Sequence, residues 1–212
     1  MGSQFGRQSA VLTEKMDFDD RNAWRPELPQ TQSGREFERK ALRIRKFAGR
    51  SPHIPIDPYE LARRLNVIVV TIDDLNGVSE EARQQLLKTD VDGWSGGATP
   101  VLLDGSRIVV LNPAHSLRRR AATLMEELCH IMLGHTADRL GVANGDADNR
   151  DYNANREREA YGVGAAVLLP FVALRSRLER RIEPRLIARE FGVSVDLVKY
   201  RAKITGLWKL VF

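Results

Sequence analysis

The chain has 212 residues, of which 42% are hydrophobic and 29% are charged, and its formal net charge is +5. These values are ordinary for a soluble globular protein and suit one sizeable domain with a helical appendage. The single cysteine, Cys129, excludes an internal disulfide, and no stretch approaches the roughly 20 apolar residues that a bilayer-spanning helix needs.

The N-terminal region is predicted to be a flexible tail followed by two helices. Residues 1–32 mix Gly, Ser, Gln, Asp and Pro without periodicity, and they contain no apolar stretch of a secretory signal. The cytoplasm is therefore the expected compartment. Ser33 can cap a helix that extends to about residue 49, and Asp57 followed by proline predicts a second, short helix. The first helix has one apolar stripe, formed by Phe37, Ala41, Ile44 and Ala48.

The middle of the chain is predicted to contain short β-strands. Residues 66–72 include a run of four apolar β-formers, and residues 91–99 predict a weaker strand or a bulged hairpin arm. The segments 101–103 and 107–111 flank an Asp-Gly turn, which is a strong hairpin signal. Strands between helices predict an α+β fold with a small antiparallel sheet.

The second half of the chain is predicted to be helical. From Ser116 the apolar residues keep a 3.6-residue period until Gly134, which is suited to end a helix. After a polar loop, a second long helix ends before Pro170. Three shorter helices follow, at about 171–180, 184–191 and 195–204.

A candidate metal site lies on the first long helix, in the order Glu-Glu-x-x-His. Glu126 and His130 are four residues apart and therefore share one helical face, while Glu127 lies about 100° around the helix. This is the spacing of H-E-x-x-H, in which positions one and five bind zinc and the glutamate handles protons. His130 is surrounded by apolar residues, where an imidazole needs a partner.

A third ligand can come from the second long helix. Its start carries Glu157 and Glu159, and small residues that permit a close approach to a neighbouring helix follow them. Zinc catalysis requires three protein ligands and one open position, so a carboxylate from this helix would complete the set.

These two segments together resemble the ImmA/IrrE metallopeptidases. The family signature is H-E-x-x-H followed by a helix that begins E-x-x-A and closes in Leu-Leu-x-Pro. Here the closing run is Leu168-Leu169-Pro170, one residue shorter than that form. The resemblance extends over roughly residues 37–207, and its strongest part is the downstream helix.

The resemblance implies a mostly helical, zincin-like peptidase core at residues 33–170 and a basic, helix-turn-helix-like unit at 171–212. It implies that Glu127 is the catalytic residue and that His130, Glu157 and Glu126 bind the metal, with Glu159 left as a solvated bystander. The implied activity is zinc-dependent cleavage of a protein substrate, namely a helix-turn-helix repressor in a stress or phage response.

Glu126 is a departure from the family, which has histidine at this position. A shell of two glutamates and one histidine carries charge −2, which lessens the Lewis acidity of a bound metal and favours harder ions such as manganese. Three states are therefore open: a zinc peptidase with a glutamate ligand, a manganese enzyme, and a metal-free family member. The metal-free form would act as a regulatory module that binds DNA or protein.

Several other residues near the motif have less defined roles. Tyr152, Tyr161 and His115 are candidates to stabilise the oxyanion of a peptidase reaction. His135 lies five residues after His130, a poor spacing for the same helical face, and is interpreted as a helix-end residue. Cys129 is interpreted as a small core residue.

The C-terminal helices carry a basic excess, with ten Lys and Arg against four Asp and Glu in residues 171–212. Gly192 and Ser194 fit the turn and cap of a helix-turn-helix. Lys199, Arg201 and Lys203 are then candidates for contacts with nucleic acid phosphates. The alternative is that the three helices only pack against the peptidase core.

Overall fold

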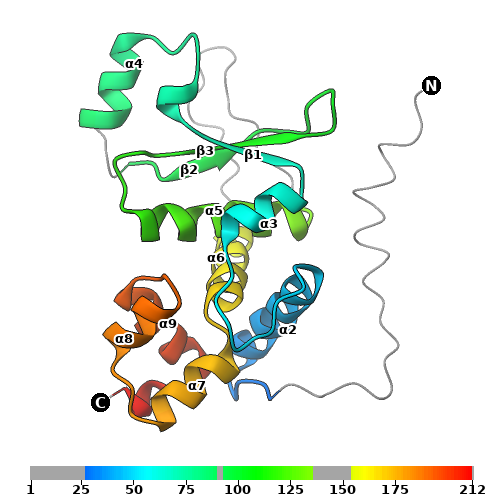
Figure 1. The fold of residues 1–212 in the computed structure, drawn as a ribbon, viewed down its shortest axis with the longest axis vertical. Coiled ribbons are helices and arrows are strands. Elements are labelled where there is room, and N and C mark those ends of the chain that lie inside the picture. The colour runs from blue at the N-terminus through cyan, green and yellow to red at the C-terminus, as the bar shows by residue number, and fades with distance from the viewer. Residues whose placement is uncertain (1–26, 90–92, 136–153, 212) are drawn as a thin grey trace, which may run out of the picture.

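The computed structural model describes residues 27–89, 93–135 and 154–211, and it confirms the α+β class (Figure 1). Its helices are α2 (Gln32–Phe47), α3 (Pro58–Arg64), α4 (Glu80–Gln84), α5 (Leu117–Met132), α6 (Ala154–Leu168), α7 (Phe171–Glu179), α8 (Pro184–Glu190) and α9 (Val195–Thr205). Its strands are β1 (Val67–Thr71), β2 (Gly96–Ala98) and β3 (Arg107–Leu111). Short 3-10 turns lie at Ile72–Asp74 and Trp208–Leu210, and a π-helical turn lies at Gln85–Thr89.

Helix α5 lies between the sheet and the remaining large helices (Figure 1). It contacts the strands β2 and β3 and the helices α3 and α6. In Figure 1 the sheet lies above α5 and α6 lies below it. Helices α2 and α9 in turn pack against α6, so that α6 has neighbours on several sides. Eight of its residues are buried, which agrees with the small side chains predicted for a closely packed helix.

The sheet is mixed, and the prediction of an antiparallel sheet was wrong in this respect. The strand order is β1-β3-β2, in which β2 runs antiparallel and β1 runs parallel to β3. The chain leaves β1 through α4 and passes through β2 before it enters β3. A connection of that length allows β3 to run in the same direction as β1, which a tight hairpin does not.

The predicted hairpin has the expected turn but a different partner strand. Gly105 has a φ of +82°, and Asp104 accepts a hydrogen bond from the Ser106 amide at 2.9 Å. Residues 101–103 form no strand, and Leu103 is fully exposed. Strand β2 pairs with β3 instead. Gly96 of β2 lies so close to α5 that a Cβ there would come within 2.8 Å of the Thr123 side chain.

Local capping signals explain where most helices begin. Asp57 and Ser194 each accept a hydrogen bond from a backbone amide of the first turn, as predicted, and Ser116 caps α5 in the same way. Helix α2 differs, because Thr31 caps it and Ser33 lies inside it. The predicted tail falls almost entirely outside the described residues. The apolar stripe of α2 is buried, with Phe37, Ala41, Ile44 and Ala48 each at most 5% exposed.

A buried ion pair fastens the C-terminal helices to α2. Arg201 on α9 donates to Glu38 at 2.5 Å, and both side chains are fully buried. Glu38 also accepts the Phe171 amide at the start of α7, at 2.8 Å, while Arg201 donates to the Leu169 carbonyl at 2.9 Å. Of the three candidates for phosphate contacts, Arg201 is therefore ruled out by its burial, whereas Lys199 and Lys203 are exposed.

Among the described residues, no single helix has the length and apolar composition needed to cross a bilayer. Helices α6 and α7 meet that test only as a pair, and they are bent by 56° at the break between them.

Candidate metal centre

Helix α5 presents Glu126 and His130 on one face because they are one turn apart. The opposite side of the helix is anchored by Leu124 and Leu128, which are fully buried. Ser116 caps the helix, and its Oγ accepts a hydrogen bond from the Arg119 amide at 3.3 Å. The buried side of α5 fixes how the helix is rotated about its axis, so the face that carries Glu126 and His130 is fixed as well.

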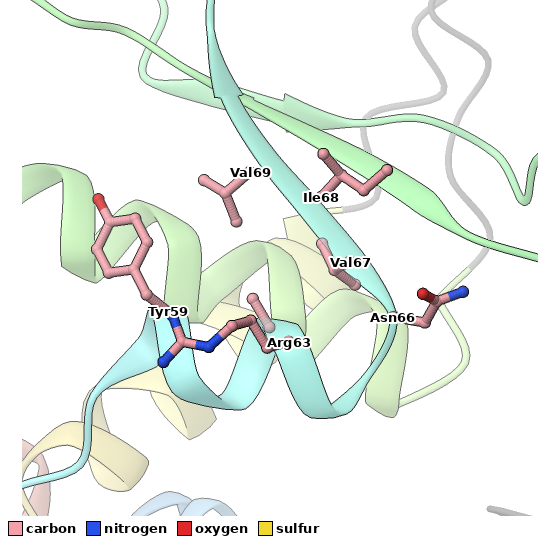
Figure 2. A pocket seen from close by; sticks show the side chains of 7 residues that line it. Tyr59, Arg63, Asn66, Val67, Ile68 and Val69 are labelled. Carbon is pink, nitrogen blue, oxygen red and sulfur yellow. The ribbon is translucent and has the colours of Figure 1, made fainter.

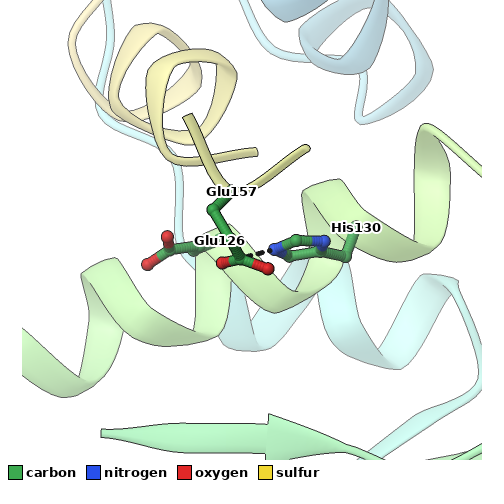
Figure 3. Close-up of side chains that lie close together, drawn as sticks. All are labelled: Glu126, His130 and Glu157. Carbon is green, nitrogen blue, oxygen red and sulfur yellow. Dashed lines mark ion pairs between the residues drawn. The ribbon is translucent and has the colours of Figure 1, made fainter. Parts of the chain in front are cut away.

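Helix α6 brings Glu157 to the same place (Figure 3). The ligand atoms of Glu126, His130 and Glu157 lie within 4.8 Å of one another, and Glu157 Oε2 is 3.5 Å from His130 Nε2. Helices α5 and α6 approach each other closely at Gly164. Its missing Cβ would already lie 3.5 Å from the Glu126 backbone.

The donor set fits a divalent metal ion. Two carboxylate oxygens and one imidazole nitrogen are common ligands of zinc and manganese. Two ligands bound to zinc at tetrahedral angles lie about 3.4 Å apart, close to the 3.5 Å between His130 and Glu157. Glu126, His130 and Glu157 would hold the ion.

The electrostatics of the site also favour a cation. Burial raises the pKa of Glu126 to about 7, and the charges of Glu127 and Glu157 add to this effect. Burial, followed by the charge of Glu157, likewise raises the pKa of Glu127 to about 7. Three carboxylates are held close together in a partly buried place, so a positive ion would relieve their repulsion.

His135 follows the end of α5, as predicted for a helix-end residue, and it also contacts His130 of the site. Gly134 adopts a φ of +70° and ends α5, after which the His135 amide donates to the His130 carbonyl at 3.0 Å. The two rings meet edge to face, with Nδ1 of His135 3.1 Å from Nδ1 of His130. Helical spacing could not show this contact, because the chain reverses at the glycine.

Glu159 is also not a solvated bystander. Its Oε2 lies 3.1 Å from Nε2 of His135, and its Oε1 accepts a hydrogen bond from Lys40 on α2. Sequence reasoning also left Tyr200 of α9 out of the site region. Its ring packs edge to face against Tyr161, at 4.9 Å between centroids, and the charge of Glu126 helps to raise the pKa of both phenols, after burial as the main cause.

Three further residues singled out in the sequence are His115, Tyr152 and Cys129. His115 is buried, and Tyr152 lies outside the described residues. Cys129 is fully buried, as predicted for a core residue, and burial together with the charge of Glu126 raises the pKa of its thiol far above the usual range.

A pocket of about 400 Å³ lies away from the triad, between α3 and β1 (Figure 2). Its lining is mixed in polarity and includes Tyr59, Arg63 and Asn66. None of the triad residues lines it.

One comparison identifies a family. The model of a peptidase family described as the IrrE N-terminal-like domain matches residues 80–203. The match extends from α4 into α9 and includes all three triad residues, although it begins later than the expected resemblance at residue 37. No curated protein matches the chain.

Proposed function

Because the chain belongs to the family of IrrE N-terminal-like peptidase domains, we propose that it is a metal-dependent endopeptidase. The observation that carries this proposal is that two helices bring ligand atoms of Glu126, His130 and Glu157 within 4.8 Å of one another. The shared face of α5 supplies two of these side chains, and the crossing of α6 supplies the third. This arrangement provides three ligands and leaves a further coordination position for water or substrate.

Glu127 is the proposed proton-transfer residue. A divalent ion, when bound, polarises the scissile carbonyl and makes water more acidic. Glu127 accepts the proton of the attacking water and passes it to the leaving amine. Burial raises the pKa of Glu127 in the metal-free protein to about 7, and a raised pKa makes a carboxylate a stronger base.

Zinc is the proposed metal, with manganese as the alternative. Imidazole and carboxylate ligands both bind zinc, and the family resemblance favours it. The second carboxylate, Glu126, increases the negative charge of the site, which favours a harder ion. The two cases are separated by loading purified protein with zinc or with manganese and measuring its peptidase activity, which should be higher with the native metal.

The proposed substrate is a helix-turn-helix repressor, cleaved in the cytoplasm during a stress or phage response. This part of the proposal is supported by the resemblance to ImmA/IrrE proteins. It predicts that co-incubation with such a repressor produces discrete fragments, and that Glu127→Gln, which retains the size of the side chain but removes its basicity, produces none.

Metal content tests the site directly. Protein purified without chelator should contain near-stoichiometric zinc or manganese, and Glu157→Ala should lose it. Glu60→Ala is a matched control, because Glu60 is a partly exposed glutamate that pairs with Arg50 and Arg64 away from the triad. Substoichiometric metal that Glu157→Ala leaves unchanged would instead support a regulatory module without turnover. The replacement of the family's first histidine by Glu126 is the observation that favours this second candidate.

A further inference from the structure

His130 has two ring nitrogens, and the structure gives each a separate neighbour. Nε2 faces Glu157 at 3.5 Å, on the side of the proposed metal. Nδ1 lies 3.1 Å from Nδ1 of His135. When one ring nitrogen of a histidine binds a metal, the other nitrogen carries the proton and donates a hydrogen bond. The group that accepts this hydrogen bond therefore stabilises the metal-binding tautomer.

We propose that His135 is a positioning residue that holds His130 in the tautomer needed to bind metal, and that Glu159 and Lys40 hold His135 in turn. This inference rests on the proposed metal site. It extends that site by a linear series of contacts, which runs from His130 on α5 through His135 to Glu159 on α6 and then to Lys40 on α2.

The protons of this series follow from the ring chemistry. If His130 presents the Nε2 lone pair to the metal, its Nδ1 carries the proton and donates it to Nδ1 of His135. Nδ1 of His135 must then lack a proton, so its Nε2 carries one. That N–H has an acceptor in place, because Glu159 Oε2 lies 3.1 Å away. Each contact therefore has one donor and one acceptor.

Glu159 is suited to end the series as a charged acceptor. Its Oε1 accepts a hydrogen bond from the Lys40 ammonium, and an ammonium partner stabilises the ionised form of a carboxylate. The ionised carboxylate strengthens the hydrogen bond from His135, since charge-assisted bonds are about twice as strong as neutral ones. The His135 side chain is only 8% exposed, so water competes little for these contacts.

The backbone supports the same placement. Gly134 in the left-handed region lets the His135 amide bond to the His130 carbonyl, and the Gly134 amide donates to the Ile131 carbonyl at 3.3 Å. This pair of bonds is the Schellman ending of a helix. His135 is therefore fixed beside His130 by main-chain geometry as well as by its ring.

The first test is the zinc affinity of the full chain, measured by competition with a chelator. His135→Ala should weaken zinc binding about 10- to 100-fold, the range found when outer partners of metal ligands are removed. His135→Asn should retain affinity within about threefold of wild type, because its Oδ1 can take the place of Nδ1 as acceptor. Glu159→Gln should have a smaller effect than His135→Ala, and Glu60→Gln none.

The series of contacts also predicts that losses of zinc affinity are not additive when two of its residues are changed together. In a His135→Asn background the shorter side chain no longer reaches Glu159, so Glu159→Gln should cause no further loss of affinity. Long-range proton–nitrogen NMR of the zinc-loaded protein should show His130 protonated at Nδ1 in wild type and in His135→Asn. Both variants lose the ring of His135, so a shift or broadening of this signal in His135→Ala beyond that in His135→Asn reports the loss of the acceptor.

Two results would overturn the proposal, and they differ in what they imply. Wild-type protein that binds zinc through Glu157, with unchanged affinity and NMR signals in His135→Ala, removes the positioning role but leaves the peptidase proposal intact. Wild-type protein whose zinc binding does not depend on Glu157 removes both. Melting temperatures of each variant show that a loss of zinc binding does not come from unfolding.

Discussion

Glu126 lies one helical turn before His130, at the position where the family signature has histidine, and its carboxylate oxygen is within 4.8 Å of both other ligand atoms. We predict that Glu126→His tightens zinc binding by on the order of tenfold, or about 1.4 kcal/mol, because neutral imidazole suits zinc and removes one repelling carboxylate. Chelator competition measures the change, with Glu60→His as the control. Unchanged affinity would show that Glu126 is not a ligand.

The raised pKa values of Glu126 and Glu127 also predict that the stability of the metal-free protein depends on pH. Their folded-state pKa of about 7 exceeds the ordinary value of 4.5, so between these pH values the folded protein binds more protons than the unfolded chain. Stability of the metal-free protein should therefore fall as the pH rises from about 4.5 to about 7 and then stay level. Bound zinc should suppress this loss.

The measurement is the melting temperature of chelator-treated protein at pH 5 and pH 8. Glu127→Gln removes one of the two groups, so its melting temperature should fall less between these values than that of wild type. Parallel pH profiles for the two proteins would contradict the raised pKa of Glu127.

At the scale of elements, substitution of two glycines of α6 should change the stability of the protein in opposite directions. A Cβ at Gly162 would come within 2.4 Å of the Phe37 ring of α2, while a Cβ at Gly164 would meet the α5 backbone at an ordinary 3.5 Å. Gly162→Ala should destabilise the protein by about 1–3 kcal/mol through overpacking. Gly164→Ala should be neutral or stabilising by up to about 1 kcal/mol, because alanine favours helix.

Urea unfolding of both variants tests this difference, and each serves as the control for the other. Equal effects of the two substitutions would mean that α6 does not approach α2 as closely as the structure shows. Zinc affinity should change little in Gly164→Ala, since no atom needs to move near Glu126.

For the molecule as a whole, the pair of Glu38 and Arg201 joins segments that are 163 residues apart. Arg201→Met leaves a buried carboxylate without its cation and should destabilise the protein by about 3–5 kcal/mol. Adding Glu38→Gln should recover part of this loss, because the amide oxygen can still accept the Phe171 amide without a buried charge. Denaturant unfolding measures both. A double variant as unstable as Arg201→Met would show that the buried charge is not the cause.

Because Arg201 is buried, a test of nucleic acid binding needs to change only the other two candidate residues. Only the exposed Lys199 and Lys203 of the three candidate residues can reach phosphates without unfolding. If they do, replacing both with glutamine should reduce the salt slope of duplex binding by about two units. Since α9 packs against α2 and α7, we expect equal, weak binding by wild type and variant in titrations at two salt concentrations.

The sequence by itself determined the features that depend on near neighbours along the chain. Caps at Asp57 and Ser194, the helix end at Gly134 and the i, i+4 pair of Glu126 and His130 each involve residues within one or two turns. Their geometry follows from the helix alone. The motif pair also identified the family, because its two parts keep characteristic spacings.

Only the tertiary structure decided the partners of His135, Glu159 and Arg201 and the parallel direction of β1. Lys40 and Glu159 are 119 residues apart, and no periodicity connects them. The left-handed conformation at Gly134 turns His135 back onto His130, against the helical spacing. Likewise, Arg201 lies in a basic segment whose charge suggests solvent, but the crossing of α9 and α2 places Glu38 beside it. Such contacts arise from the packing of whole helices, and a linear pattern carries no record of which distant side chains that packing brings together.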